Sequence, residues 1–189
     1  MRLSNIIFVI LLFLIGVTEC RIFERKRWRK PLVTWKFDDP HGLLSDRQKL
    51  IVSELAENAF DEWRYALEGL LKIRKIDENV LTPADITISF AKRNHSCIEP
   101  FDGRGGVVAH STYPSIGILH LDADELWHTG DRSKGDVDLR YVLIHEIGHV
   151  LGLRHSSRKS SVMRRNYRET KKSFKLSKYD IRAIRKLYN

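Results

Sequence analysis

The sequence predicts a single α+β domain in which three helices pack on a twisted mixed sheet of five strands. Two kinds of pattern predict it. Short stretches in which apolar and polar residues alternate are typical of half-buried strands, and longer stretches with apolar residues three or four apart are typical of amphipathic helices. The 189 residues are enough for one hydrophobic core and too few for two of good size.

The first strand and the first helix have clear patterns. Apolar and polar residues alternate over residues 33–37, which predicts a strand. Ser45 and Gln48 have the spacing of a capping box, and apolar residues follow at helical intervals as far as Leu67. We therefore expect a long amphipathic helix whose apolar face covers the sheet.

The remaining elements are predicted from shorter patterns. The four further strands are expected at residues 71–74, 86–90, 107–110 and 118–121. A second helix is expected from about Asp138 to Gly152, and a third runs from a Ser177 cap through Leu187. No internal repeat or low-complexity tract interrupts this order.

Residues 145–155 read HExxHxxGxxH, a spacing suited to a catalytic zinc ion. His145 and His149 are four residues apart, so on a helix they lie on one face and both can reach an ion roughly 2 Å away. Gly152 can adopt the left-handed conformation that ends the helix and turns the chain, so that His155 supplies a third nitrogen. Three protein ligands leave one position for water, whose pKa zinc lowers toward about 7.

Glu146 directly follows the first of these ligands. It is placed to take the proton of the water and later to hand it to a leaving amine. A structural zinc would not need this glutamate. The residues therefore predict a hydrolytic zinc site, and the alternative interpretation is an ordinary core helix that carries histidines.

A second group of metal-ligand residue types lies in or beside the short middle strands. It consists of His95, Cys97, His110 and His120. One thiolate and three imidazoles form a closed zinc site, which is structural because no ligand position stays open. The alternative for Cys97 is a free buried thiol or a thiol paired with another chain.

The same segment also offers oxygen ligands. Residues 102–105 and 122–125 supply carboxylates and glycine carbonyls, which calcium prefers. Without a disulfide framework, a loop of this length is expected to be held by such ions.

The N-terminus has the features of an export signal. A basic start and an apolar run over residues 6–17 predict a signal peptide at residues 1–20, followed by a short basic pro-like segment at residues 21–27. The run is shorter than the roughly 20 residues of a membrane span. We therefore expect secretion to the extracellular space or matrix, with an N-terminal signal anchor as the alternative.

The net charge of +9 bears on partners. In an exported protein an acidic polysaccharide is a more natural counterpart than nucleic acid, and the alternative is a solvated basic surface without a particular partner. Nucleic acid is not expected as a partner, and a monomer is expected.

Taken together, these residues resemble the catalytic domain of the matrix metalloproteinases (matrixins), within the metzincin clan, over residues 28–189. Ser156 directly after His155 is the matrixin form of the motif. Met163, eight residues after His155, fits the Met-turn that lies beneath the zinc ligands in the family. Residues 100–110 and 120–127 are similar to the family's structural zinc and calcium loop.

The resemblance implies a zincin-like fold and a secreted zinc metalloendopeptidase that cuts extracellular matrix or other extracellular proteins before an apolar residue. Extended substrates would bind antiparallel to the strand at residues 107–109, and Tyr141 would make the specificity pocket shallow. The implied substrate-binding residues are Val108, Ala109, Tyr141 and Tyr167, and the implied calcium ligands are Asp102, Gly103, Gly105, Val107, Asp122 and Glu125. Tissue-inhibitor proteins are implied as further partners.

Two residues depart from the family pattern. Cys97 stands where the usual structural zinc ligand is an aspartate, and Arg165 occupies the usual proline position after the Met-turn. The expected organisation also has neither a cysteine-switch propeptide nor a hemopexin-like domain, so control is expected from inhibitors or from Cys20 at the zinc. The alternative from another class is a secreted, non-catalytic matrix-binding module that keeps zinc as a structural core.

Overall fold

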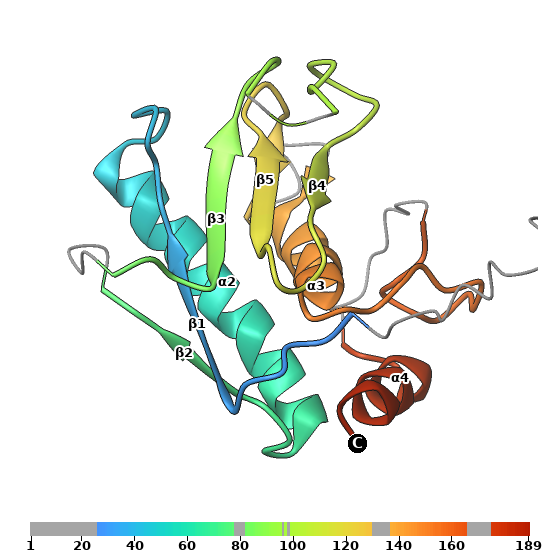
Figure 1. The fold of residues 1–189 in the computed structure, drawn as a ribbon. Coiled ribbons are helices and arrows are strands. Elements are labelled where there is room, and N and C mark those ends of the chain that lie inside the picture. The colour runs from blue at the N-terminus through green and yellow to red at the C-terminus, as the bar shows by residue number, and fades with distance from the viewer. Residues whose placement is uncertain (1–25, 78–81, 96, 98, 130–136, 166–174) are drawn as a thin grey trace, which may run out of the picture.

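The computed structural model describes residues 26–77, 82–95, 97, 99–129, 137–165 and 175–189. Its elements follow the order β1 (Leu32–Phe37), α2 (Asp46–Leu67), β2 (Lys72–Lys75), β3 (Ile86–Ala91), β4 (Ala109–Ser111), β5 (Ile118–Asp122), β6 (Trp127–His128), β7 (Val137–Asp138), α3 (Leu139–Val150) and α4 (Lys178–Tyr188). The predicted α+β fold is confirmed: in these described residues, three helices accompany a five-stranded mixed sheet (Figure 1).

The main sheet has the strand order β2-β1-β3-β5-β4. Its first four strands are parallel, and β4 is antiparallel to β5, with Ala109 opposite Leu121 and His110 opposite His120. Because β4 is the last strand in this order, one of its sides is not paired within the sheet. Among the described residues β4 is therefore an edge strand, the kind of strand with which another extended chain can pair.

Helices α2 and α3 lie on the same face of the sheet (Figure 1). The inward side chains of β1 pack against α2, where the Trp35 and Phe60 rings stack with centroids 4.6 Å apart. Ser45 forms the predicted capping box with Gln48, which satisfies free N–H groups at the start of α2. The two helices and the sheet thus share one core.

Asp138 is the N-cap of helix α3, and its side chain accepts hydrogen bonds from the Arg140 and Tyr141 N–H groups. Every residue from Tyr141 to Val150 is buried. Such all-round burial is typical of a central helix rather than of a surface helix. The Trp63 indole of α2 donates to the Ile144 carbonyl at 2.9 Å, which fixes α2 against α3.

The two ends of the described chain meet at the C-terminal end of α3. The Trp28 indole donates to the Val150 carbonyl, and the Tyr188 hydroxyl of α4 donates to the Leu151 carbonyl, each at 2.9 Å. Gly152 has the predicted left-handed backbone, with φ of +106°, and a Cβ there would lie 2.0 Å from the Lys26 carbonyl oxygen. Both its conformation and the close approach of the chain therefore require glycine.

The prediction of a strand at residues 107–110 was wrong in its bounds, because β4 covers Ala109–Ser111. Before it, Gly105 and Gly106 have positive φ, and the Val107 N–H donates to Asp102 Oδ1. These features keep Val107 in the preceding loop. Val108 also lies outside β4, although its carbonyl accepts from the Asp122 N–H at 2.9 Å.

Other predictions differ in smaller ways or fall outside the described residues. The short parallel pair β6–β7 was not predicted, because two-residue strands leave no periodic pattern. The signal peptide at residues 1–20, most of the segment at residues 21–27, and Tyr167 lie outside the described residues. Among the residues that are described, no helix is long and apolar enough to cross a membrane.

Candidate active site

Helix α3 brings together the first two predicted zinc ligands. The Nε2 atoms of His145 and His149 lie 3.1 Å apart, as expected for residues separated by one helical turn. After the turn at Gly152, His155 places its Nε2 atom 3.2 Å from that of His149. The three nitrogens therefore converge on one point.

Hydrogen bonds on the far side of two of the rings determine which nitrogen is free. The Nδ1 atoms of His145 and His149 lie 2.7 Å from the carbonyl oxygens of Val162 and Leu153, so each Nδ1 must carry the proton. Each Nε2 atom is then an acceptor without a proton. Acceptors facing one another at this distance need a cation between them, and tetrahedral zinc at about 2.0–2.1 Å from each nitrogen would hold them about 3.3 Å apart. The residues therefore fit zinc.

Burial also keeps these imidazoles in the neutral form that binds metal. It lowers the pKa of His149 to about 4, and it lowers the pKa values of His145 and His155 as well. Neighbouring imidazoles add to this effect at His149, since two positive rings would repel each other.

Met163 packs against Gly148, which precedes His149 in α3. A Cβ on Gly148 would come within 2.3 Å of the Met163 sulfur, so the two residues are in close contact. The Met163 carbonyl accepts from the Ser156 N–H at 2.7 Å, which joins this segment to the residue after His155. The residue expected to form a Met-turn is thus held next to both α3 and the segment after His155.

Glu146 projects from α3 beside the histidines and is 7% exposed. Burial raises the pKa of its carboxyl to about 7, and a hydrogen bond from Ser111 opposes that rise. The Ser111 hydroxyl donates to Glu146 Oε2 at 2.5 Å. Ser111 was not predicted, because it is far from the motif in sequence and only the packing of β4 on α3 brings it near.

A cleft of about 590 Å³ runs between β4 and α3 and contains the three histidines and Glu146. Of the predicted substrate-binding residues, Val108, Ala109 and Tyr141 line it, and Val107, which was predicted as a calcium ligand, lines it too. The Tyr141 hydroxyl donates to the Val162 carbonyl at 3.2 Å, which fixes its ring at one wall. Glu99, Arg164 and Arg165 also line the cleft and were not predicted to do so.

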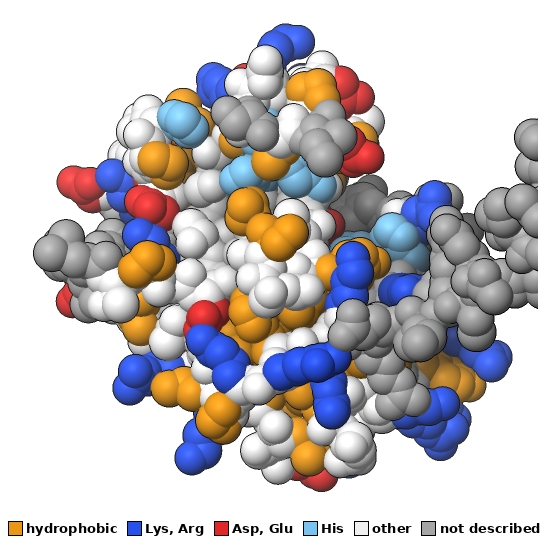
Figure 2. Space-filling model, viewed as in Figure 1, with side chains coloured by type: hydrophobic (Ala, Val, Ile, Leu, Met, Phe, Trp, Pro, Cys, Tyr) orange, Lys and Arg blue, Asp and Glu red, His pale blue; other side chains and the backbone are white. Residues whose placement is uncertain are grey.

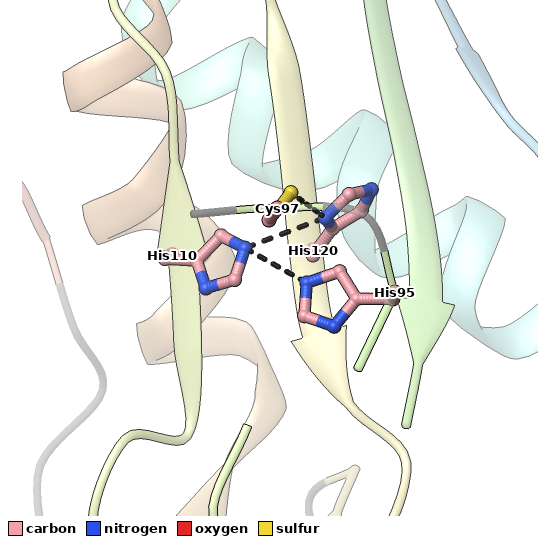
Figure 3. A group of neighbouring side chains, drawn as sticks. All are labelled: His95, Cys97, His110 and His120. Atoms are coloured by element: carbon pink, nitrogen blue, oxygen red, sulfur yellow. Dashed lines mark hydrogen bonds between the residues drawn. The ribbon is translucent and has the colours of Figure 1, made fainter. Parts of the chain in front are cut away.

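The second predicted metal group also assembles. His110 of β4 and His120 of β5 face each other, and His95 and Cys97 reach them from the loop after β3 (Figure 3). The ligand atoms of the four side chains all lie within 4.8 Å of one another. The Cys97 sulfur lies 3.3 Å from His120 Nδ1, and the Nε2 atoms of His95 and His110 are 3.1 Å apart.

The surroundings of this group also fit a metal ion. His95 Nδ1 lies 2.7 Å from the Arg93 carbonyl oxygen, so its Nε2 atom is free of a proton. Burial lowers the pKa of His120 to about 4. Burial also raises the pKa of Cys97, an effect that a bound cation reverses because it favours the thiolate.

The predicted calcium residues lie beside this group. Glu125 Oε1 accepts from the Gly105 N–H at 2.6 Å, which joins the two acidic segments. Burial raises the pKa of Glu125, and the charges of Asp122 and Asp102 add to the rise. Asp122 Oδ2 is buried and makes no hydrogen bond to any described residue. A carboxyl whose ionisation is disfavoured by two neighbouring carboxylates, one of them with a buried oxygen that makes no hydrogen bond to a described residue, fits a calcium ion.

A buried helix that carries HExxH, a third histidine after a glycine turn, and a cleft beside an edge strand together define the class of zinc metalloendopeptidases. The model of the matrixin family matches residues 27–189, which is most of the chain. The protein therefore belongs to the matrixin family, and membership implies dependence on zinc.

Individual relatives agree with this assignment. Macrophage metalloelastase from Rattus norvegicus is 37% identical over 169 residues, which is 87% of this chain and 34% of the relative. Matrilysin from Felis catus is 38% identical over 169 residues, or 87% of this chain and 61% of the relative. Metalloendoproteinase 1 from Glycine max is 44% identical over 172 residues, or 87% and 53%. The chain thus spans less than two thirds of the length of each of them.

Proposed function

We propose that the protein is a secreted endopeptidase that uses zinc held by His145, His149 and His155 to hydrolyse peptide bonds in extracellular proteins. The convergence of three Nε2 atoms, two of them without a proton, beside the carboxylate of Glu146 carries this proposal. When bound, zinc supplies Lewis-acid chemistry, which makes water acidic enough to attack a carbonyl near neutral pH.

Glu146 acts as the general base. Its carboxylate accepts a proton from the attacking water and returns it to the amine that leaves when the peptide bond breaks. The raised pKa of this carboxyl suits both steps, because a group with a pKa near 7 can accept and release a proton at neutral pH. Proton transfer by a positioned group of this kind accelerates reactions by about 10² to 10⁴-fold.

Substrates bind as extended chains along the free side of β4. Main-chain hydrogen bonds along a strand edge give affinity without regard to sequence, and pockets for side chains give specificity. Tyr141 limits the depth of the pocket beside the zinc, so we propose cleavage before apolar residues of moderate size. Val108 and Ala109 flank the path of the substrate.

The second metal group has a structural role in this proposal. Zinc held by His95, Cys97, His110 and His120 would tie the loop after β3 to β4 and β5, and calcium at Asp102, Asp122 and Glu125 would hold the adjacent loop. A closed four-ligand zinc site binds no substrate and contributes to folding. These ions would thereby stabilise the wall on which the substrate lies.

The extracellular location rests on the sequence. The apolar run at residues 6–17 predicts export, and the basic surface suits acidic polysaccharide outside the cell. Figure 2 shows lysine and arginine side chains over the lower part of the molecule, around α4 and the lower ends of β1 and β2.

Cleavage of a quenched fluorescent peptide with a central Gly-Leu bond tests the proposal. The purified protein should cut it, a chelator should abolish cleavage, and added zinc should restore it. Glu146→Ala should lower kcat by at least about 100-fold while leaving bound zinc unchanged, because the residue moves protons and does not hold the metal.

A folded protein that binds zinc at the three histidines and cuts neither this peptide nor denatured matrix proteins would contradict the proposal. That result would instead support a non-catalytic matrix-binding module. Equal cleavage by wild type and Glu146→Ala would show that the activity comes from a contaminant.

A further inference from the structure

The side chain of Ser111 contacts the carboxylate of Glu146 at the floor of the cleft. Its Oγ atom lies 2.5 Å from Glu146 Oε2 and 3.3 Å from the Glu146 main-chain carbonyl oxygen. A hydroxyl carries only one proton to donate, and a donor to a carboxylate makes a shorter and stronger bond than a donor to a neutral carbonyl. The distances therefore assign this proton to the carboxylate.

Both partners of this hydrogen bond are fixed by their backbones. Ser111 is the last residue of β4, where it pairs with Leu119, and the next residue along the chain, Thr112, donates its N–H to the Ile118 carbonyl at 2.9 Å. Glu146 lies in the buried part of α3. The hydrogen bond thus joins the substrate-binding strand to the catalytic helix across the cleft.

Glu146 has a flexible side chain, and its carboxylate could otherwise take up several orientations. A donor at Oε2 selects one of them. With Oε2 held by Ser111, Oε1 is the oxygen left to accept a proton from water. Orientation of this kind matters because a displacement of about 1 Å in a catalytic group can lower a rate by about 10²-fold.

We propose that Ser111 is a positioning residue that holds the carboxylate of Glu146 in the orientation in which it accepts the proton. Ser111 does not touch the substrate bond; it acts through Glu146. This inference rests on the proposed function, since it assigns Ser111 a part in that same reaction.

The test compares Ser111→Ala with Thr112→Val, a matched control that removes the neighbouring hydroxyl of the same segment. The Thr112 hydroxyl faces the main chain of Ile118 and makes no hydrogen bond with Glu146. Ser111→Ala should lower kcat by about 10-fold or more, with KM and bound zinc close to those of wild type. Thr112→Val should keep kcat within about twofold. Ser111→Cys, which keeps the volume but offers only a weak donor, should resemble Ser111→Ala.

A double-mutant cycle separates positioning from a structural role. Glu146→Asp shortens the side chain by one methylene, which takes the carboxylate out of reach of Ser111. Removing the Ser111 hydroxyl in that background should therefore change kcat by less than about twofold. An equal loss in both backgrounds, or a Ser111→Ala variant with wild-type kcat, would overturn the inference and leave the proposed function standing. Failure of wild type and Thr112→Val to cut any peptide would overturn both.

Discussion

Gly148 shows how tightly the catalytic helix is packed on the segment beneath it. A methyl group at this position would come within 2.3 Å of the Met163 sulfur and 3.0 Å of the Trp63 ring. Real side chains do not approach so closely, so any larger residue would push Met163 away or move α3. The contact fixes how closely α3 packs on the Met163 segment and on Trp63.

Tyr141 is the residue that we expect to set the depth of the specificity pocket. Tyr141→Leu removes a ring that is 8% exposed at the cleft wall and leaves space for a longer substrate side chain. Two peptides are compared that carry either a long aromatic residue or leucine directly after the cleaved bond. We expect the ratio of their kcat/KM values, aromatic to leucine, to rise by about 10-fold in the variant, since filling such space contributes about 1–3 kcal/mol. A series of peptides that differ only at this position measures the ratio.

Tyr141→Phe is the matched control for that prediction. It keeps the ring and removes the hydroxyl that donates to the Val162 carbonyl. The ratio should stay within about twofold of wild type. If Tyr141→Phe and Tyr141→Leu changed the ratio equally, the hydrogen bond to Val162 and not the ring would determine the specificity.

At the level of single residues, the sequence predicted the groups whose chemistry is distinctive. Histidines at fixed spacing and an adjacent glutamate have few other uses, and the structure brings the predicted ligand atoms together. Ser111 and Gly148 were missed for a physical reason. A serine in a strand and a glycine inside a helix have many ordinary roles, and their partners Glu146 and Met163 become neighbours only through tertiary packing.

Helix α4 is attached to the metal site through one buried carboxylate. Asp180, which is 2% exposed, accepts from the Ser161 hydroxyl, from the Val162 N–H at 3.2 Å, and from the N–H and hydroxyl of its own cap, Ser177. The Val162 carbonyl in turn accepts a hydrogen bond from His145 Nδ1. The helix therefore supports the segment that orients a zinc ligand.

Asp180→Ala should destabilise the protein and weaken zinc binding. It leaves several buried donors without an acceptor, each of which costs about 1–3 kcal/mol. We expect the free energy of unfolding to fall by about 3 kcal/mol and zinc affinity to fall by about 10-fold or more, as for other groups that orient a ligand. Urea denaturation and competition with a zinc chelator measure the two effects.

Asp61→Ala provides the control, because Asp61 pairs with Arg64 on the exposed side of α2. An exposed ion pair contributes little, so stability should change by less than about 0.5–1 kcal/mol and zinc affinity should not change. Similar losses in both variants would show that the effect of Asp180→Ala is not specific to the Met163 segment.

Elements with local signals were predicted well, and those that depend on distant contacts were not. The capping boxes at Ser45 and Ser177 involve residues three apart and can be recognised directly in the sequence. The bounds of β4 depend instead on where β5 lies and on Asp102, which draws Val107 into the loop. A local pattern of apolar residues cannot report either contact.

Cys97 joins the loop after β3 to β4 and β5, and its replacement tests whether its thiolate holds a metal. Cys97→Ala should reduce the zinc retained after dialysis from two ions to about one, because three imidazoles alone hold zinc less firmly than a closed set of four ligands. Cys97→Asp, which restores a charged ligand, should retain more zinc than Cys97→Ala. Two retained ions in Cys97→Ala would show that Cys97 is a free thiol.

Across the whole molecule, the two histidine groups link metal binding to the effect of pH on stability. In the metal-free folded chain, the pKa values of His120 and His149 are lowered to about 4. In the unfolded chain they are near 6.5. The pKa values of His110, His145 and His155 are also lowered. Between pH 6.5 and about 4 the unfolded chain therefore binds protons that the folded chain does not.

The sign of the effect follows from this difference. As pH falls through that window, protons stabilise the unfolded chain, and the free energy of unfolding of metal-free protein should fall. The buried His149 alone can contribute at most about 1.4 kcal/mol per pH unit. Glu146 acts in the opposite direction, because its raised pKa of about 7 makes the folded chain take up a proton between pH 7 and 4.5.

Metal-free protein should therefore unfold at a lower urea concentration at pH 5 than at pH 7. The difference should be larger in Glu146→Gln, which lacks one of the carboxyls, Glu146 and Glu125, whose raised pKa values oppose the effect. Metal-free His149→Gln should show a smaller difference, because one lowered pKa is removed. At pH 7, added zinc should raise the urea midpoint of wild type and of Glu146→Gln, since the bound ion stabilises only the folded chain. In His149→Gln the rise should be small. A midpoint that does not change with pH in metal-free Glu146→Gln would mean that the histidines are solvated without metal, and that the ions themselves assemble both sites during folding.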